Sequence, residues 1–481
     1  MIDATLDRTS AKIWPACGDL KPQGAILLIS CYELGHQPLN LAFPRAYLQR
    51  VGYQPVAIDT SVESLDADVI ARARFVAVSV PMHTALRLGA QITERVRREN
   101  PDALICFYGL YAWLNAEYLL REHGDFVIGG EYEHPLLELV QALETGGSVT
   151  VAGVSDRAFR AEPSLARIDF AFPDREELPP VKEYAHLLID GLAVPAGYTE
   201  ATRGCHHTCL HCPVVPIYRG RFFAVPRQTV LEDIRRQVAQ GVGHITFGDP
   251  DFLNGPTHAL RICRAMHAEF PHVTFDFTAR IDHILGNREI VPELRELGCV
   301  FVLTAVESIS ELVLSKIDKG HTKQDVIEAL EVLDQAGIAM RPSLLPFTPW
   351  TTLDDYLELL EFFEAYDLIG NVDPVHFSIR LLVPPGSALL DDPDAGQWAG
   401  PLDESVYTHV WKHPDSRVDD LRRAVAKLVE TAASCDADAH DTFAGVKSLA
   451  CAAKGITPEA MPPMRRGPTK QPPRLTESWF C

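Results

Sequence analysis

The segment TRGCHHTCLHCPV, residues 202–214, places three cysteines within eight positions of a 481-residue chain that holds 11 cysteines in all. Cys205, Cys209 and Cys212 recur at i, i+4 and i+7, which is also the spacing of one face of an α-helix. A buried stripe of small apolar residues is therefore one interpretation of the spacing. A glycine and a proline bracket the cysteines and three histidines lie among them, so the segment favours a loop with a chemical role.

Three thiolates so close together indicate a metal centre. A structural zinc ion takes four ligands, and a neighbouring histidine, His206, His207 or His211, could complete its tetrahedron. No second CxxC pair accompanies the motif, which counts against zinc. A four-iron cluster usually takes four cysteines. Three cysteines leave one iron with open coordination positions, as in a catalytic rather than a structural metal site.

The overall composition is that of an acidic globular protein. Hydrophobic residues make up 47% of the chain and charged residues 23%, and 44 Lys+Arg against 65 Asp+Glu give a formal charge of −21. A protein that binds phosphate backbones needs a basic face, so we expect no nucleic-acid partner and a small-molecule substrate. The first residues lack a basic stretch followed by an apolar core, and no apolar run reaches the roughly 18 residues of a membrane span. We therefore expect no membrane association and a cytoplasmic location.

Strand-like and helix-like stretches alternate along the first part of the chain. Short apolar runs such as AILLIS, FVAVSV and ALICFYG are each followed by a helical pattern such as ALRLGAQITERVRREN. That alternation is typical of an α/β fold with a doubly wound parallel sheet, which binds ligands at the carboxyl ends of its strands. We expect residues 1–147 to form a Rossmann-like domain. Residues 148–195, rich in proline and charge, are predicted to form a linker.

A second alternation runs over residues 196–390. After a first strand near Ala196, the segments HITFGDPDF, VTFDFTARID, CVFVLTAVES, AMRPSLLPF and VHFSIRLLV are predicted as five more strands with helices between them. Six such units predict a partial or complete βα (TIM-like) barrel. Beyond about Asp391 we expect no further strand. Residues 391–481 are predicted to hold two helices, at 418–434 and 442–454, and an extended basic, proline-rich tail.

The CxxxCxxC motif at the end of a first barrel strand resembles that of the radical S-adenosylmethionine (SAM) enzymes. The resemblance implies that Cys205, Cys209 and Cys212 bind a 4Fe-4S cluster whose open iron chelates the amino and carboxylate groups of SAM. In that family an electron from the reduced cluster cleaves a carbon–sulfur bond of SAM and gives a carbon radical. A reducing partner of the flavodoxin or ferredoxin type is therefore expected.

Further segments resemble the SAM-binding motifs of the same family. HITFGDPDF stands at the acidic second-strand motif, so the resemblance implies that Asp249 and Asp251 contact the methionine ammonium of SAM. TAVESIS resembles the fourth-strand segment that approaches the SAM ribose, with Glu307 and Ser308 as candidates. Arg341 is the candidate partner of the SAM carboxylate. For each acidic residue, a helix cap or a solvated turn is the ordinary alternative.

The predicted first domain resembles the cobalamin-binding-like domain that precedes the barrel in one subgroup of these enzymes. The segments FVAVSVPMHTALRLGAQI and DFVIGGEYEHPLLELVQAL carry this resemblance, and it makes cobalamin a candidate third cofactor. No DxHxxG segment occurs. In YGLYAW, the bulky Leu110, Tyr111 and Trp113 stand where the subgroup has paired glycines, which alone let a backbone approach a ligand closely. A domain that only covers the barrel mouth is the alternative.

The end of the chain, TESWFC, resembles the start of the tail in the CUAEP/CCAEP-tail radical SAM proteins, some of which are selenoproteins. The resemblance implies a redox or thiophilic role for Cys481, next to a selenocysteine or cysteine that follows it. Such an adjacent pair is soft and has a low pKa. An ordinary chain end that happens to finish on cysteine is the alternative.

These resemblances favour a radical SAM enzyme that cleaves SAM reductively and modifies a small molecule. Three reactions stay open: methyl transfer through cobalamin, hydrogen abstraction by a 5′-deoxyadenosyl radical, and transfer of a 3-amino-3-carboxypropyl group to a thiophilic atom such as arsenic, as in arsinothricin-type biosynthesis. A tRNA-modifying enzyme and a zinc scaffold protein are two further classes. The acidic charge balance counts against a tRNA-modifying enzyme. The lack of a second CxxC pair counts against a zinc scaffold protein.

Overall fold

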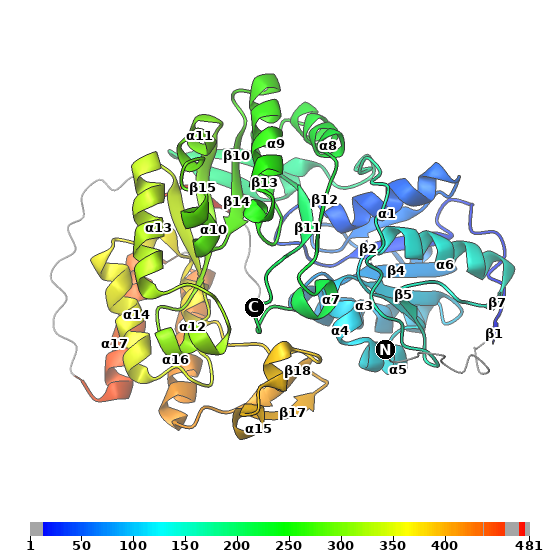
Figure 1. Cartoon of the computed structure of the whole chain (residues 1–481). Helices are drawn as coiled ribbons and strands as arrows, with labels where there is room; N and C mark the ends of the chain where they lie inside the picture. Colours follow the sequence, from blue (N-terminus) through cyan, green and yellow to red (C-terminus); the bar gives the residue numbers. More distant parts are fainter. Residues whose placement is uncertain (1–12, 436, 457–470, 477–481) are drawn as a thin grey trace, which may run out of the picture.

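Two largely parallel sheets organise the computed structural model of Figure 1, which describes residues 13–435, 437–456 and 471–476. The first sheet is blue to cyan and the second green to yellow. Helices pack around both, so the predicted α/β fold class is confirmed. No helix in the described ranges is both long and apolar enough to cross a bilayer.

The first sheet has the strand order of a doubly wound domain. Its order is β3-β2-β4-β5-β6-β8, and all neighbours pair in parallel except the last two, which are antiparallel. The chain continues from β2 to β3 on one side of it and then to β4 on its other side. Ligands in such folds bind at this switch point, at the carboxyl ends of the strands. The strands are β2 (Ile26–Ser30), β3 (Val56–Asp59), β4 (Phe75–Ser79), β5 (Leu104–Tyr108), β6 (Phe126–Ile128) and β8 (Val154–Ser155).

Both faces of this sheet are covered, which explains why its strands are continuously apolar. Alternate side chains such as Leu28 and Ala77 pack with α1 (Leu39–Arg50) and α6 (Glu133–Thr145). The intervening side chains pack on the other face against α2 (Ala67–Arg72), α3 (His83–Glu99), α4 (Leu110–Leu114) and α5 (Ala116–Glu122). A short pair, β1 (Ile13–Trp14) with β7 (Gly147–Ser148), lies outside the sheet.

The second sheet is a half-barrel of five parallel strands, extended at one edge. Its order is β16-β15-β14-β13-β10-β9-β19, where β9 (His186–Ile189) and β19 (Arg474–Leu475) are antiparallel additions. The parallel strands are β10 (Leu192–Thr199), β13 (His244–Phe247), β14 (Thr274–Ala279), β15 (Cys299–Glu307) and β16 (Ala339–Leu344). The helices between and after them are α8 (Arg227–Ala239), α9 (Pro256–Glu269), α10 (Ile281–Gly286), α11 (Val291–Glu296), α12 (Glu311–Lys316), α13 (Lys323–Ala336) and α14 (Leu353–Ala365).

Local sequence signals set where these helices begin and end. Thr322 and Thr352 each begin a helix with a capping box, in which an aspartate three residues later bonds back to the threonine backbone. Gly337 ends α13 in the left-handed region, at a φ of 71°. The remaining elements are α7 (Val215–Tyr218), α15 (Ala395–Trp398), α16 (Ser416–Ser434), α17 (Ala439–Lys454) and the 3-10 turns η1 (Val181–Glu183), η2 (Phe252–Asn254), η3 (Ile369–Asn371), η4 (Pro374–Ser378) and η5 (Ala388–Asp391).

Three predictions for the second half of the chain are wrong. The expected sixth strand, VHFSIRLLV, instead begins in η4 and reaches the sheet through a single bridge between Phe347 and Arg380. Prolines on either side of it limit the ladder. Strands do follow Asp391, as the hairpin of β17 (Ala399–Asp403) and β18 (Thr408–Trp411). The tail also contributes β19, because the backbone of Arg474 and Leu475 pairs with β9.

The loop after β2 carries a buried carboxyl group that makes stability depend on pH. Glu33 is 6% exposed, and its Oε2 accepts hydrogen bonds from the first backbone N–H groups of α1. Burial, and then the charge of Asp59, raise the pKa of Glu33 from 4.5 to about 8. The folded chain therefore keeps a proton that the unfolded chain releases, and the stability this proton confers is lost as the pH rises through about 8.

We predict that Glu33→Gln flattens the alkaline side of the stability profile. Between pH 6.5 and 8.0 the free energy of unfolding should fall by about 1–2 kcal/mol less in Glu33→Gln than in the wild type. Urea denaturation at both pH values measures the difference. Glu162→Gln, at an exposed side chain, is the control. An identical fall in all three proteins would contradict the prediction.

Candidate active site

The three motif cysteines lie in one loop beyond the carboxyl end of β10, hereafter the cysteine loop (residues 205–212). It follows β11 (Thr202–Gly204), which pairs with β12 (Phe222–Ala224). Gly204 has a φ of 76°, and a Cβ there would lie 2.5 Å from the carbonyl oxygen of Arg221. Only glycine suits such a position. The turn therefore delivers Cys205 and Cys209, 9% and 7% exposed, to the barrel mouth, together with the half-buried Cys212.

An arginine from the end of β14 touches the middle thiol. Nη1 of Arg280 lies 2.6 Å from Sγ of Cys209. Its other nitrogens donate to the carboxylate of Asp282, at 2.8 and 3.1 Å, and to the carbonyl oxygen of Lys319. The guanidinium is thus fixed in place beside the Cys209 sulfur. Burial raises the pKa of Cys212 to about 11, so this thiol ionises readily only when a metal binds it.

The spacing of the three sulfurs differs from that of a zinc site. A tetrahedral zinc ion with Zn–S bonds of 2.3 Å holds its sulfurs about 3.8 Å apart. Within the described residues, the cysteine sulfurs do not form a group whose members all lie within 4.8 Å of one another. Three thiols at a wider spacing suit a larger inorganic group, and thiolates are the usual ligands of iron–sulfur clusters.

The two aspartates after β13 hold the backbone around this loop. Oδ2 and Oδ1 of Asp249 accept hydrogen bonds from the Ala201 N–H, at 2.9 Å, and the Thr202 hydroxyl, at 2.6 Å. Asp251 caps η2 through the Leu253 N–H and accepts the Arg280 N–H at 3.2 Å. Both carboxylates are almost completely buried. The capping alternative thus applies to Asp251, and the contact of either aspartate with SAM stays a prediction.

Burial also shifts the pKa of Asp249, from 3.8 to about 7, with the hydrogen bonds of Thr202 and Ala201 opposing the shift. Its carboxyl group therefore gains negative charge close to neutral pH. Because Asp249 bonds to the strand that leads into the cysteine loop, this titration acts directly on the backbone that positions the thiols.

Glu307 reaches the cysteine loop from the end of β15. It adopts a φ of 61°, uncommon for a residue with a side chain. Its Oε1 lies 3.0 Å from Nζ of Lys319 and 3.8 Å from Nε2 of His211. Burial acts to raise the pKa of Glu307, but Lys319 and His211 outweigh burial and hold it well below its usual range. The sequence analysis did not single out Lys319. Ser308, the residue after Glu307, accepts the Ser310 N–H through its hydroxyl oxygen.

Arg341 lies deeper in the barrel than Glu307. It pairs in register with Leu303, whereas Glu307 pairs with Leu344. Its Nη2 lies 2.9 Å from Oδ2 of Asp373, and its Nη1 donates to the Pro473 carbonyl at 3.4 Å. The tail thus closes the barrel beside Arg341. A contact between Arg341 and the SAM carboxylate stays a prediction, and Cys481 lies outside the described residues.

A cavity of about 110 Å³, with both apolar and charged side chains in its lining, lies inside the barrel next to Arg341. Tyr198 and Asp276 line it from the strands, and His36 lines it from the loop after β2. His244 and Thr246 anchor the Asp276 carboxylate at 2.7 Å each. Side chains of both charge signs therefore face this space, which suits a small polar ligand.

The carboxyl edge of the first sheet is the place to test for cobalamin. After β2, the carbonyl oxygen of Gly35 accepts the Ala185 N–H at 2.8 Å. After β4, Nε2 of His83 lies 2.8 Å from the carbonyl oxygen of Val406 in the β17–β18 hairpin. Two loops of this edge are therefore bound directly to other parts of the chain.

The loop after β5 fills the space that faces the cysteine loop. Trp113 and Leu114 of α4 share one hydrophobic cluster with Cys205 and Cys212. Tyr111 is 8% exposed, and its pKa lies above the usual range because of burial and then the negative charge of Cys212. The side chains of α4 and the cysteine loop thus belong to one packed cluster.

The loop after β6 is occupied as well. Glu131 and Glu133 pair with Arg203, at 3.0 and 2.5 Å, two residues before Cys205. All four loops of this edge bind protein groups, and α4 shares a hydrophobic cluster with the cysteine loop. These contacts count against a corrin at this edge.

The sequence profile of the radical SAM superfamily matches residues 199–363 of this chain. An uncharacterized methyltransferase of Pyrococcus horikoshii is 24% identical over 334 residues, which cover 67% of this chain and 69% of that protein. The hopanoid C-3 methylase of Methylococcus capsulatus is 25% identical over 326 residues, covering 65% of this chain and 62% of that protein. This chain thus spans less than two thirds of the methylase.

Among solved structures, the cobalamin-dependent S-adenosylmethionine radical enzyme OxsB with aqua-cobalamin and S-adenosylmethionine bound is similar to this chain. The TM-score is 0.64 at 16% identity, over 85% of this chain and 67% of that chain. At this identity the likeness concerns the fold.

The profile match contains the cysteine loop and the strands β13 to β16. A domain of this kind implies a 4Fe-4S cluster and SAM as cofactors, and three cysteine thiols beside a guanidinium are a donor set that fits such a cluster. Residues 199–363 form a radical SAM domain, and the chain is an enzyme.

Proposed function

We propose that this enzyme cleaves SAM reductively at a 4Fe-4S cluster held by Cys205, Cys209 and Cys212, and that it modifies a small polar molecule. The observation that carries the proposal is the loop that brings three thiols to the barrel mouth, with Arg280 against Cys209. When bound, a reduced cluster supplies the electron that breaks a carbon–sulfur bond of SAM. A low-potential partner of the flavodoxin or ferredoxin type, in the cytoplasm, would deliver that electron.

The residues around the loop have separate tasks in this proposal. Arg280 offsets negative charge at the thiolates, and the ion pair of Glu307 with Lys319 fixes the loop from the β15 side. Asp249 and Asp251 set the backbone that presents the thiols, and we propose that they and Ser308 lie beside bound SAM. The cavity beside Arg341 is the proposed substrate site, because it holds groups of both charge signs within the barrel.

The SAM bond that breaks is the finer part of the proposal. One of the two relatives is named a methyltransferase and the other a methylase, which favours methyl transfer. The packing of α4 against the cysteine loop opposes the cobalamin route to it. Transfer of a 3-amino-3-carboxypropyl group to a thiophilic atom stays a hypothesis, because it rests on the tail, where residues 477–481 lie outside the described part of the chain.

Anaerobic reconstitution followed by product analysis tests the function. The reduced protein is incubated with SAM, and its nucleoside products are separated by mass. We expect 5′-deoxyadenosine or methylthioadenosine, in amounts that depend on both reductant and cluster. An intact SAM pool under these conditions would contradict reductive cleavage.

We also predict that the enzyme works without cobalamin. Incubation with hydroxocobalamin and removal of the excess should leave well under one equivalent on the chain, and SAM cleavage should be unchanged. The double variant Tyr111→Gly, Trp113→Gly removes two bulky side chains of α4. It should therefore bind at least as much hydroxocobalamin as the wild type. One tightly bound equivalent in the wild type, required for SAM cleavage, would contradict this prediction.

A further inference from the structure

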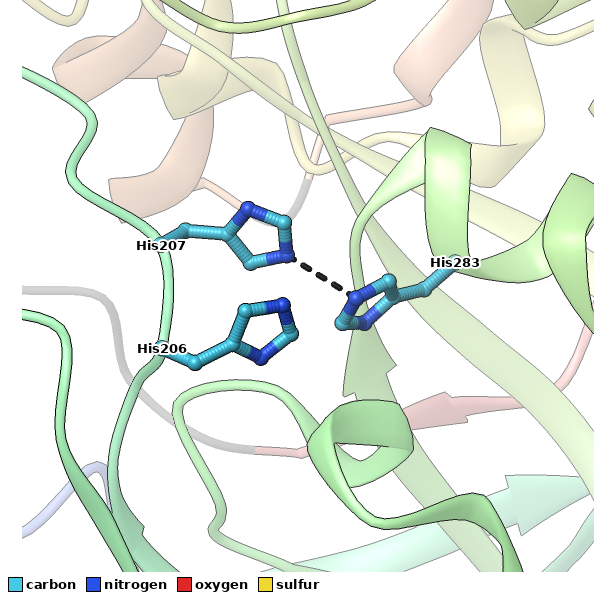
Figure 2. A group of neighbouring side chains, drawn as sticks. All are labelled: His206, His207 and His283. Atoms are coloured by element: carbon cyan, nitrogen blue, oxygen red, sulfur yellow. Dashed lines mark hydrogen bonds between the residues drawn. The ribbon is translucent and has the colours of Figure 1, made fainter.

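Three histidines from two distant segments meet beside the cysteine loop. His206 and His207 belong to the loop, and His283 belongs to α10. Their ring centroids are separated by 4.0, 4.6 and 5.1 Å, and Figure 2 shows the three rings turned toward one another. One ring nitrogen from each lies within 4.8 Å of the other two. Among the residues that the structure describes, no other three His, Cys, Asp or Glu side chains meet this condition.

Neighbouring oxygens fix the tautomers of two of these rings. Nδ1 of His206 lies 2.8 Å from Oδ1 of Asn254, which accepts hydrogen bonds but cannot donate them. Nδ1 of His283 lies 2.9 Å from Oδ2 of the buried Asp251 carboxylate. The hydrogen bond places the proton of His206 on Nδ1 and leaves a lone pair on its Nε2. The Asp251 carboxylate favours the same arrangement at His283 through an ion pair.

This arrangement is that of a metal site with its supporting groups. Metal-binding histidines usually donate their second ring N–H to a carboxylate or carbonyl oxygen, which orients the ring. Asp251 and Asn254 are almost completely buried, so they hold His283 and His206 rigidly. The third ring, that of His207, is held by a hydrogen bond between its Nε2 and Nε2 of His283, which are 2.9 Å apart.

The distances suit one ion after a small adjustment. Nitrogens on a tetrahedral zinc ion, with bonds of 2.0–2.1 Å, lie about 3.3 Å apart. The Nε2 atoms of His207 and His283, 2.9 Å apart, are slightly closer than that, and the other nitrogen pairs lie within 4.8 Å. Ring rotations that move each nitrogen by about 1 Å would bring all three to zinc-binding distance. The ion would take the place of the proton between the two Nε2 atoms, and that proton would move to Nδ1 of His207, so that all three rings bind as neutral imidazoles.

We propose that His206, His207 and His283 bind a divalent transition-metal ion of the zinc class, separate from the ligands of the cysteine loop. Imidazole nitrogens select zinc and its neighbours over calcium and magnesium, which prefer oxygen. Three protein ligands leave a fourth position, and His206 is exposed, so that position faces solvent. The site therefore takes water or a small anionic or thiol ligand as its fourth partner. This proposal does not depend on the proposed function.

Zinc K-edge X-ray absorption on the cluster-loaded protein tests the site, because it sees zinc and not iron. One zinc per chain should show about three nitrogen ligands at 2.0–2.1 Å and no sulfur at 2.3 Å. His207→Ala and His283→Ala should each lower zinc retained after gel filtration, and the double variant should retain none. The exposed His272→Ala is the matched control and should keep its zinc.

Iron content shows whether the variants fold, since the iron of the double variant should equal that of the wild type. Sulfur at 2.3 Å would mean that zinc has entered the cysteine loop and would overturn the proposal. Zinc unchanged in the double variant would overturn it as well. If iron is absent from all proteins while the nitrogen-bound zinc persists, the proposed function fails and the histidine site stands.

Discussion

Alanine in place of Cys209 is expected to abolish reductive cleavage of SAM. Cys209 is the thiol that Arg280 contacts, so its removal takes away one of three cluster ligands and leaves a buried guanidinium facing a void. A cluster with two cysteine ligands should not survive gel filtration. The formation of 5′-deoxyadenosine or methylthioadenosine, measured with reductant in excess, should drop to the rate without enzyme.

Cys435→Ala is the matched control for this variant. Cys435 is exposed at the end of α16, far along the chain from the cysteine loop. The Cys435→Ala variant should retain iron, sulfide and SAM cleavage at wild-type levels. Should Cys209→Ala keep a full complement of iron and cleave SAM, the loop would be a structural feature and another site would hold the cluster.

Methionine in place of Arg203 is expected to lower the free energy of unfolding by about 3–5 kcal/mol, because it leaves buried carboxylates without their cation. Arg203 is 6% exposed and pairs with Glu131, Glu133 and Glu200. Its guanidinium also lies 4.7 Å from the centre of the Phe43 ring. These contacts join the first sheet's edge to the strand before the cysteine loop.

Protonation should soften the effect of this substitution at low pH. Burial raises the pKa of Glu133 and of Glu200 to about 7 each, even with Arg203 opposing the shift. Both carboxyl groups therefore take up protons more readily once the arginine is gone, and the loss of stability should be smaller at pH 6 than at pH 8.

Urea denaturation of the apoprotein measures both effects of Arg203→Met. Arg264→Met is the control, because Arg264 is an exposed residue paired with Glu293, and such pairs contribute about 0–1 kcal/mol. A loss at Arg203 no larger than that of the control, or one that grows as the pH falls, would contradict the account of this junction.

The sequence allowed the parallel strands of both sheets and the cysteine loop to be predicted because each depends on a local signal. Continuous apolar runs such as ILLIS and FVAVS are buried on both faces, and the spacing of Cys205, Cys209 and Cys212 is set within eight residues. Bulky residues in YGLYAW likewise counted against a glycine-lined ligand loop. In the structure α4 shares a hydrophobic cluster with the cysteine loop.

The missed features depend on contacts between distant segments. Arg203 meets Glu131 and Glu133, which lie 72 and 70 residues away in the sequence. His283 and His207 are 76 residues apart, so no local sequence pattern predicts either contact. The strand β19 has only two residues, Arg474 and Leu475, and gains its place from β9. The expected sixth strand failed in the opposite way, since an apolar run was present but its neighbours were prolines.

Electron paramagnetic resonance of the reduced, reconstituted protein with and without SAM tests the central claim most directly. Three cysteine ligands leave one iron open, so SAM should bind there and change the signal of the reduced four-iron cluster. We predict such a signal in the wild type, a clear shift on addition of SAM, and no signal in Cys209→Ala. A four-iron signal that SAM leaves unchanged, or the absence of any iron signal from the wild type, would contradict the account.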